Sequence, residues 1–181
     1  MANDLWETPP AVYKRLNKEF SFLADMAASK HNAKCRIFYT EEDNSLGFDW
    51  AYRMGVDKVI LNEYGEVGSV FVNPPYSNPM PWVKKAIEAQ ADGLTVVMLL
   101  NADPSVGWWA EAMPYVSEIR FIIAEKTPTG KYSSGRIGFI DSDGNEANGN
   151  SKPQCVFVFD PFRVGWQVTR YIPKSEFYHE D

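Results

Sequence analysis

The stretch Asn73-Pro74-Pro75-Tyr76 combines two hydrogen-bond acceptors with a flat aromatic face. The acceptors are the side-chain oxygen of Asn73 and the backbone carbonyl of Pro74. This carbonyl is held rigidly, because each proline fixes its own φ and restricts the residue before it. Two such acceptors can draw an amino nitrogen toward a tetrahedral shape, which activates an amine whose lone pair is delocalised into a ring. The stretch therefore predicts chemistry on an exocyclic amine such as that of adenine.

Tyr76 indicates how such a base would be held. The amine of a paired adenine is engaged by its partner, so the nucleotide would have to rotate by about 180° out of the stack. The aromatic ring of Tyr76 would then receive the base, and such stacking contributes about 1–3 kcal/mol per base. The alternative is that the tetrapeptide only ends a strand, since paired prolines stop strands. Its place between an apolar strand and a helix favours the functional interpretation.

Alternating strands and helices position this stretch, and their order predicts an α/β fold with a largely parallel sheet. One helix is expected over Pro10 to Glu19, with Thr8 as its N-cap. Two further helices are expected, from Pro79 to about Ala91 and over Val106 to Met113. The strands are expected at Phe20 to Asp25, Cys35 to Tyr39, Lys58 to Leu61, Val67 to Val72, Thr95 to Leu100 and Ser117 to Ala124.

The order of elements places the tetrapeptide at the carboxyl end of the strand Val67 to Val72, the edge where open α/β sheets bind ligands. The pattern changes toward the C-terminus. Arg136 to Asp141 and Gln154 to Asp160 resemble strands joined by a turn without a helix, which predicts a C-terminal antiparallel hairpin. The segments 125–135 and 143–153 are rich in Gly, Ser, Asn, Lys and Thr, show no periodicity and are expected to be loops.

Length and composition set further limits. The 181 residues are 45% hydrophobic and 23% charged, which predicts one domain over residues 1–181 without a separate target-recognition domain. No apolar run approaches the roughly 20 residues of a membrane span, and the N-terminus lacks a signal peptide, so we expect a cytoplasmic protein with no membrane association. Cys35 and Cys155 have neither disulfide nor zinc spacing and are expected to be buried and reduced. A net charge of −6 argues against avid non-specific binding to nucleic acid, but allows a local basic face.

Several short motifs, in this order, resemble the phage-encoded DNA N6-adenine methyltransferases of the Dam type. They are Trp6 to Pro9, Phe22 to Ala28, Asn32 to Cys35, Tyr39 to Asp43, Leu46 to Trp50, the Asn73 tetrapeptide and Gly135 to Ile137. The resemblance covers roughly Leu5 to Pro161. It implies a Rossmann-like S-adenosylmethionine-dependent methyltransferase fold, S-adenosylmethionine as cofactor, and a flipped adenine in DNA as substrate. For a phage-encoded enzyme it also implies the host cytoplasm.

The resemblance further implies which residues bind the cofactor. Thr8 and Pro9 would hold its methionine end, a role that Thr8 can combine with capping a helix. Asp25 ends the first strand and would meet the ammonium group, while Ala27 and Ala28 are small enough to let the ligand approach the backbone. Most methyltransferases carry a glycine-rich turn at this point, which both the Dam-type family and this chain lack.

An acidic run follows the second strand. Asp43 is the residue that we expect at the ribose hydroxyls, by analogy with the acidic residue of dinucleotide-binding folds. Glu41 and Glu42 are alternatives for the same role. A solvated acidic turn without a ligand is the alternative for all three.

Basic residues gather around the segment Thr127 to Gly135. Lys126, Lys131 and Arg136 are the candidates for contacts with DNA phosphates, and the alternative is ordinary solvated surface charge. Nothing else in the sequence indicates which target would be read.

Two tryptophans and the two histidines are further polar or aromatic residues that bear on the site. Trp108 and Trp109 follow the carboxyl end of another strand, where they either wall the adenine pocket or belong to the core. His31 and His179 have no partners at metal-ligand spacing, so they receive no function and no metal is expected.

Three other functions compete with DNA adenine methylation. The tetrapeptide also occurs in methyltransferases that act on RNA bases or on protein glutamine, but these usually carry the glycine-rich turn and a separate substrate domain. A non-catalytic, methyltransferase-like phage protein that binds nucleic acid is a second alternative, against which the intact tetrapeptide argues. A nucleotide-binding oxidoreductase is set aside, because no G-x-G-x-x-G follows the first strand.

Overall fold

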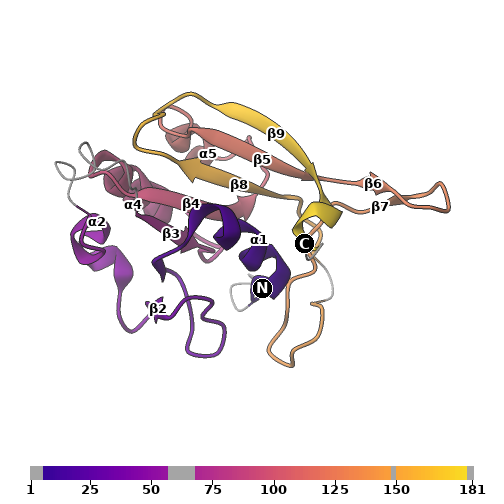
Figure 1. Cartoon of the computed structure of the whole chain (residues 1–181), viewed down its shortest axis with the longest axis horizontal. Coiled ribbons are helices and arrows are strands. Elements are labelled where there is room, and N and C mark those ends of the chain that lie inside the picture. The colour runs from indigo at the N-terminus through magenta and orange to yellow at the C-terminus, as the bar shows by residue number, and fades with distance from the viewer. Residues whose placement is uncertain (1–5, 57–67, 148–149, 179–181) are drawn as a thin grey trace.

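The computed structural model describes residues 6–56, 68–147 and 150–178 (Figure 1). The helices are α1 (Pro10–Phe20), α2 (Trp50–Arg53), α4 (Met80–Ala91) and α5 (Gly107–Ala112), with 3-10 helices η1 (Ser45–Gly47) and η2 (Lys174–Phe177). The strands are β1 (Ala24–Asp25), β2 (Ile37–Phe38), β3 (Ser69–Val72), β4 (Thr95–Asn101), β5 (Glu118–Ile123), β6 (Glu125–Lys126), β7 (Tyr132–Ser133), β8 (Gln154–Phe159) and β9 (Val168–Pro173).

Seven strands form the main sheet in the order β2-β1-β3-β4-β8-β5-β9. The first four are parallel to one another, and β9 is parallel to β5. β8 lies between β4 and β5 and runs antiparallel to both, so β4 and β5 point in the same direction. The carboxyl ends of β1, β3, β4 and β5 therefore share one edge of the sheet. The predicted α/β, mostly parallel, Rossmann-like fold is confirmed.

The structure also contains an antiparallel hairpin separate from the main sheet, but other residues form it. β6 pairs with β7 inside the segment 125–135, for which the sequence predicts a loop. Arg136 to Asp141 is not a strand, since Ile140 makes only isolated bridges, to Glu7 and to Glu146. The predicted second arm, β8, instead has neighbours on both sides. Its six buried residues suit the interior of a sheet better than a terminal hairpin.

The N-terminal strands are shorter than predicted. α1 continues through Phe20 and ends where Ser21 takes the left-handed conformation with φ of 51°, which leaves β1 only Ala24–Asp25. β2 is restricted to Ile37–Phe38. The predicted strand Lys58 to Leu61 lies outside the described residues. The other predicted helices and strands are present close to their predicted bounds, whereas the edge strand β9 was not predicted.

Apolar side chains cover both faces of the sheet. Val96 of β4 packs with α2, α4 and α5, whereas its neighbour Val97 packs on the opposite face with α1 and η2. This arrangement explains why β4 is an almost continuous apolar run. Trp108 and Trp109 are buried with α5 on the first face, and the Trp109 ring meets Phe157 edge-on at 4.7 Å. The core interpretation of the two tryptophans is therefore correct.

A charged network is buried on β5. Arg120 and Glu118 are only 5% and 2% exposed. Arg120 donates to both carboxylate oxygens of Glu19 in α1, at 2.7 and 2.6 Å, and through Nε to Glu118 at 2.8 Å. Arg170 of β9 makes a further ion pair with Glu118 at 2.9 Å. The network therefore connects α1, β5 and β9 through side chains whose charges are all compensated.

The remaining expectations concern membranes and thiols. Within the described ranges, no helix is both long and apolar enough to cross a bilayer. Both cysteines are free thiols, with Cys155 buried in β8. Cys35 is only partly buried, and its Sγ lies 2.8 Å from the hydroxyl of Tyr13.

Candidate active site

The tetrapeptide begins directly after β3, in the parallel half of the sheet. β3 is buried along its whole length and pairs with β1 on one side and β4 on the other, so the start of the tetrapeptide is fixed by both neighbours. Asn73, Pro74, Pro75 and Tyr76 all line one cavity of about 700 Å³ at this edge of the sheet. The structure thus brings the four predicted residues to a common concave site.

Two polar atoms of the tetrapeptide are buried and have no hydrogen-bond partner within the described part of the chain. They are Asn73 Oδ1 and the hydroxyl of Tyr76. Burial raises the pKa of the Tyr76 hydroxyl well above its ordinary value, so this group remains protonated. The Tyr76 ring lies edge-on to Phe139, with 5.9 Å between centroids. Buried polar atoms are nearly always satisfied, so an unpartnered acceptor at a cavity indicates a site for a ligand's donor.

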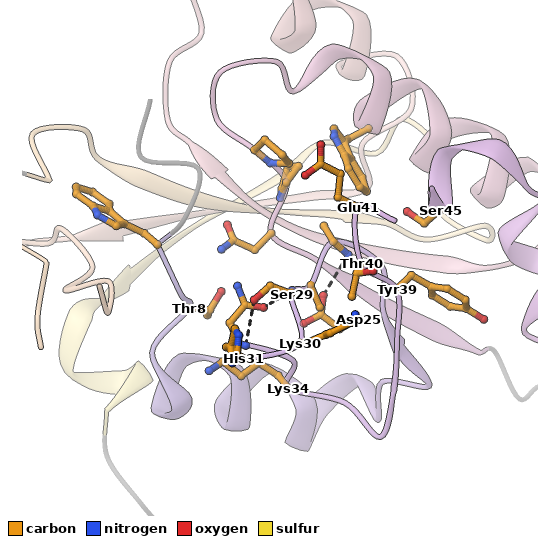
Figure 2. Close-up of a pocket in the computed structure, with 18 of the residues that line it drawn as sticks. Thr8, Asp25, Ser29, Lys30, His31, Lys34, Tyr39, Thr40, Glu41 and Ser45 are labelled. Atoms are coloured by element: carbon orange, nitrogen blue, oxygen red, sulfur yellow. Dashed lines mark hydrogen bonds between the residues drawn. The ribbon is translucent and has the colours of Figure 1, made fainter. Parts of the chain in front are cut away.

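Asp25 stands at the end of β1 and faces the same cavity (Figure 2). Backbone hydrogen bonds on both sides hold it, from Tyr39 N–H to the Asp25 carbonyl at 2.9 Å and from Met26 N–H to the Phe71 carbonyl at 3.0 Å. The side chain accepts from Ala27 N–H at 3.3 Å and is 4% exposed. Burial raises the pKa of its carboxyl to about 6. Among the described residues, no ion pair involves this carboxylate, although a backbone hydrogen bond from Lys34 and the charge of its side chain partly offset the effect of burial.

Sequence reasoning identified Ala27 and Ala28 after β1 but assigned no role to the polar residues of the loop that continues from them. Ser29 and Asn32 hold its turn, because Ser29 N–H donates to Asn32 Oδ1 at 2.6 Å and Asn32 N–H donates to Ser29 Oγ at 3.2 Å. Lys34 pairs with Glu7 at 3.0 Å, which connects the loop to the N-terminal segment. The loop lines the cavity with Ala27, Ala28, Ser29, Lys30, His31, Asn32 and Lys34. Its position after a strand's carboxyl end and its polar character were the available signals.

The N-terminal segment closes another side of the cavity. Thr8 is 3% exposed and lines the cavity, and Pro9 is buried beside it. The expectation that Thr8 caps α1 is wrong: the N-cap is Pro9, and no side chain caps the helix. The reason is that the helix begins at Pro10, one residue too late for Thr8 to occupy the N-cap position. The Thr8 hydroxyl is therefore not required by the helix.

The acidic run after β2 divides into two environments. Glu41 and Glu42 line the cavity, whereas Asp43 does not. The Asp43 carboxylate instead accepts from the N–H and the hydroxyl of Thr40, at 2.7 and 2.8 Å, and these bonds lower the pKa of Asp43. Glu42 is paired with Lys30 at 3.1 Å. Glu41 lines the cavity too, and among the described residues no ion pair or hydrogen bond engages its carboxylate, although its carbonyl accepts from Asn44 N–H at 3.1 Å.

Aromatic side chains from distant segments complete the walls, and sequence reasoning did not identify them. Trp6 stacks on Phe139 with 5.9 Å between centroids, and Trp82 packs against Trp50 at 6.4 Å. Tyr39 also lines the cavity. Their separation along the chain gives no local pattern, so only the tertiary structure brings them together.

The predicted phosphate-binding residues lie apart from the cavity. Lys126, Lys131 and Arg136 are exposed on or beside the β6–β7 hairpin, and none of them lines the cavity. His31 does line it, although no pattern in the sequence predicts a function for it. In the described residues there is no group of three or more potential metal ligands, and His179 lies outside them.

Known proteins resemble the chain over nearly its whole length. The sequence profile of the family described as DNA N-6-adenine-methyltransferase (Dam) matches residues 1–180. The DNA N-6-adenine-methyltransferase of Escherichia phage T1 is 36% identical over 177 residues, which cover 94% of this chain and 68% of the relative. That of Haemophilus phage HP1 is 35% identical over 162 residues, covering 87% and 79%. The chain therefore belongs to the DNA N-6-adenine-methyltransferase (Dam) family.

Proposed function

We propose that this DNA adenine methyltransferase binds S-adenosylmethionine and an adenine extruded from DNA in the cavity at the carboxyl edge of the sheet. The observation that carries the proposal is the buried, unpartnered Oδ1 of Asn73. An amide oxygen in this state lacks a donor, and the amino group of adenine is a donor of the right kind. The cavity volume of about 700 Å³ falls within the roughly 300–1,000 Å³ of small-molecule sites.

Asn73 and Pro74 activate the amino nitrogen. Asn73 Oδ1 and the Pro74 carbonyl accept hydrogen bonds from its two hydrogens, which draws the nitrogen out of conjugation with the ring. As the nitrogen bonds to the incoming methyl carbon, the bond from that carbon to the cofactor's sulfonium sulfur would break and leave a neutral thioether. The nitrogen then releases one of these protons to solvent, so the methylated amine is neutral. The two prolines keep the carbonyl fixed during this change, because they leave the backbone little freedom.

The tetrapeptide also receives the base. The Tyr76 ring lines the cavity, and Phe139 at its edge restricts its rotation. The adenine would reach this ring after extrusion from the duplex, and stacking on it contributes about 1–3 kcal/mol.

The donor set fits the cofactor. S-adenosylmethionine would supply the methyl group from its sulfonium centre. Asp25, as a buried carboxylate without an ion pair among the described residues, suits the ammonium group at the methionine end. Thr8 and the small Ala27 at the turn would line the same end, whereas the predicted Pro9 is buried and does not line the cavity. Glu41 suits the ribose hydroxyls better than Asp43, whose carboxylate is engaged by Thr40.

The basic residues near the hairpin provide the contact with DNA. Lys126, Lys131 and Arg136 are exposed and can neutralise phosphates without entering the cavity. The proposed site of action is the cytoplasm of a bacterial host, since both relatives are phage proteins and DNA is the substrate.

Expression in a strain that lacks adenine methylation tests the function. The genomic DNA is digested to nucleosides and N6-methyladenine nucleoside is measured by mass spectrometry, with Asn73→Ala as the inactive variant and the exposed Asn78→Ala as the matched control. We expect the product from wild type and Asn78→Ala, and none from Asn73→Ala. The inactive variant should keep its stability and cofactor affinity, because Asn73 Oδ1 has no partner to lose.

Other results would redirect the assignment. Methylation retained in Asn73→Ala refutes the proposed site. A folded wild-type protein that binds S-adenosylmethionine but leaves DNA unmethylated favours an RNA or protein amine. A folded protein that does not bind the cofactor favours the non-catalytic alternative.

A further inference from the structure

The β6–β7 hairpin projects from the body of the molecule at the edge that carries the cavity. β6 begins two residues after β5, and β5 points in the same direction as β3 and β4. Figure 1 shows the hairpin extending well beyond the main sheet, at the end of the molecule opposite α2. A substrate that enters the cavity from this edge therefore has the hairpin beside it.

The root of the hairpin is fixed to the body. Its returning arm passes so close to the end of β5 that a Cβ on Gly135 would lie 2.5 Å from the carbonyl carbon of Ile123. Only glycine permits this approach. The Ser175 hydroxyl of η2 donates to the Glu125 carboxylate on the outgoing arm. Both arms are thus held, which gives the hairpin a defined direction.

The two faces of the hairpin differ in exposure. Glu125 pairs with Ser133 and Lys126 with Tyr132, and opposite residues of an antiparallel pair share a face. The Glu125 face is partly buried, consistent with its bond to η2. Lys126 and Tyr132 occupy the other face, and the Tyr132 side chain is 76% exposed. A large aromatic ring and a cation are therefore presented together to solvent.

The local charge is opposite to that of the chain. Residues 124–136 contain Lys126, Lys131 and Arg136 against one acidic residue, Glu125, which is turned toward the body. The chain as a whole carries a net charge of −6. A projecting cationic element on an acidic protein is the arrangement expected for a polyanionic partner, because phosphate contacts supply most of the affinity for DNA.

We infer that the β6–β7 hairpin lies in a groove of the duplex beside the target adenine and reads the flanking sequence through Tyr132, an inference that rests on the function proposed above. β5 is three strand positions from β3, or about 14 Å at about 4.8 Å per strand. At about 3.4 Å per base pair this corresponds to roughly four pairs. A two-stranded ribbon fits the major groove, where a tyrosine can contact base edges while lysines bind phosphates.

Tyr132→Ala tests the inference, with Tyr52→Ala as the matched control because its ring is 85% exposed on α2, at the far end of the molecule (Figure 1). Each protein is assayed on two substrates. The first is a set of duplexes in which a single target adenine lies between flanks randomised in G and C, and the second is a trinucleotide with one adenine. The trinucleotide spans only about 7 Å and cannot reach from the cavity to the hairpin. We expect Tyr132→Ala to lower kcat/KM on preferred duplexes by about 5- to 150-fold and to flatten the flank preference. Its trinucleotide rate should equal that of wild type.

A variant without two of the lysine charges distinguishes phosphate contacts, which position the hairpin on DNA, from base contacts, which read the sequence. Lys126→Gln combined with Lys131→Gln should reduce the slope of log K against log salt concentration by about 2 without changing the flank preference, whereas the exposed Lys84→Gln should change neither.

The outcomes distinguish a failure of target reading by the hairpin from a failure of the proposed methyltransferase function. Unchanged duplex methylation by Tyr132→Ala overturns target reading by the hairpin, and equal losses on duplex and trinucleotide assign Tyr132 a structural role, which overturns it as well. A wild-type protein that methylates neither substrate while binding the cofactor refutes the proposed function instead.

Discussion

Replacing Asp25 by Asn should change the pH dependence of stability in a direction set by burial. The carboxyl of Asp25 has its pKa raised from an ordinary value of 3.8 to about 6 because it is desolvated. Well below pH 3.8 the group is protonated in both the folded and the unfolded chain. Well above pH 6 it is charged in both, and the folded chain carries an unfavourable buried charge. The contribution of Asp25 to the unfolding free energy therefore falls as pH rises from about 4 to about 6.

The size of this effect follows from the two pKa values. A difference of about two pH units corresponds to about 3 kcal/mol between the protonation states. Asn cannot ionise, so the unfolding free energy of Asp25→Asn relative to wild type should rise by about 3 kcal/mol between pH 3 and pH 7. Any loss of stability caused by burying the Asn amide is independent of pH, so it shifts the stability difference equally at low and at high pH.

Urea unfolding at closely spaced pH values, without cofactor, measures this difference. The same variant should bind S-adenosylmethionine about 10- to 100-fold more weakly at pH 7.5, because a charged hydrogen bond to the ammonium group is lost. A stability difference that stays flat from pH 4 to pH 7 would show that Asp25 is not a desolvated carboxylate. An unchanged affinity would remove Asp25 from the cofactor site.

Two further expectations concern the acidic turn and the charged network. Glu41→Gln should raise the dissociation constant of S-adenosylmethionine about 10-fold without altering Tm. Asp43→Asn should lower Tm, because it weakens the bonds to Thr40, and should leave the cofactor affinity unchanged. Calorimetry of both variants measures Tm and affinity, and the reversed pattern would restore Asp43 as the ribose ligand. Arg120→Met should destabilise the protein by about 3–5 kcal/mol in urea unfolding, since it removes one partner of the buried Glu118 carboxylate. A loss below about 1 kcal/mol would mean that the network adds little beyond packing.

Local sequence rules predicted the helices and strands whose ends are marked by residues within or next to them. α4 begins where prolines open an amphipathic stretch, and β4 is an apolar run because helices cover both of its faces. The location of the tetrapeptide followed from strand order alone, since the carboxyl ends of parallel strands meet at one edge. These features required no knowledge of distant contacts.

The features that the sequence did not predict depend on contacts between residues far apart in the chain. β8 has the composition of a buried strand, but only pairing with β4 and β5 decides that it lies between them. β9 was missed because its residues are largely exposed and show no apolar alternation. Within the site, sequence could not separate Glu41 from Asp43, because their orientations depend on the hydrogen bonds that Thr40 makes in the folded turn.

The insertion of β8 has a consequence for biosynthesis. β4 ends at Asn101 and β8 begins at Gln154, 53 residues later. Translation adds roughly 5–20 residues per second, so the edge of β4 that pairs with β8 stays unpaired for about 3–10 seconds before β8 is synthesised. During that interval the unpaired edge is open to incorrect pairing with other chains. Yield in cells should therefore depend on elongation speed between these two strands and on chaperones that cover β4 until the sheet closes.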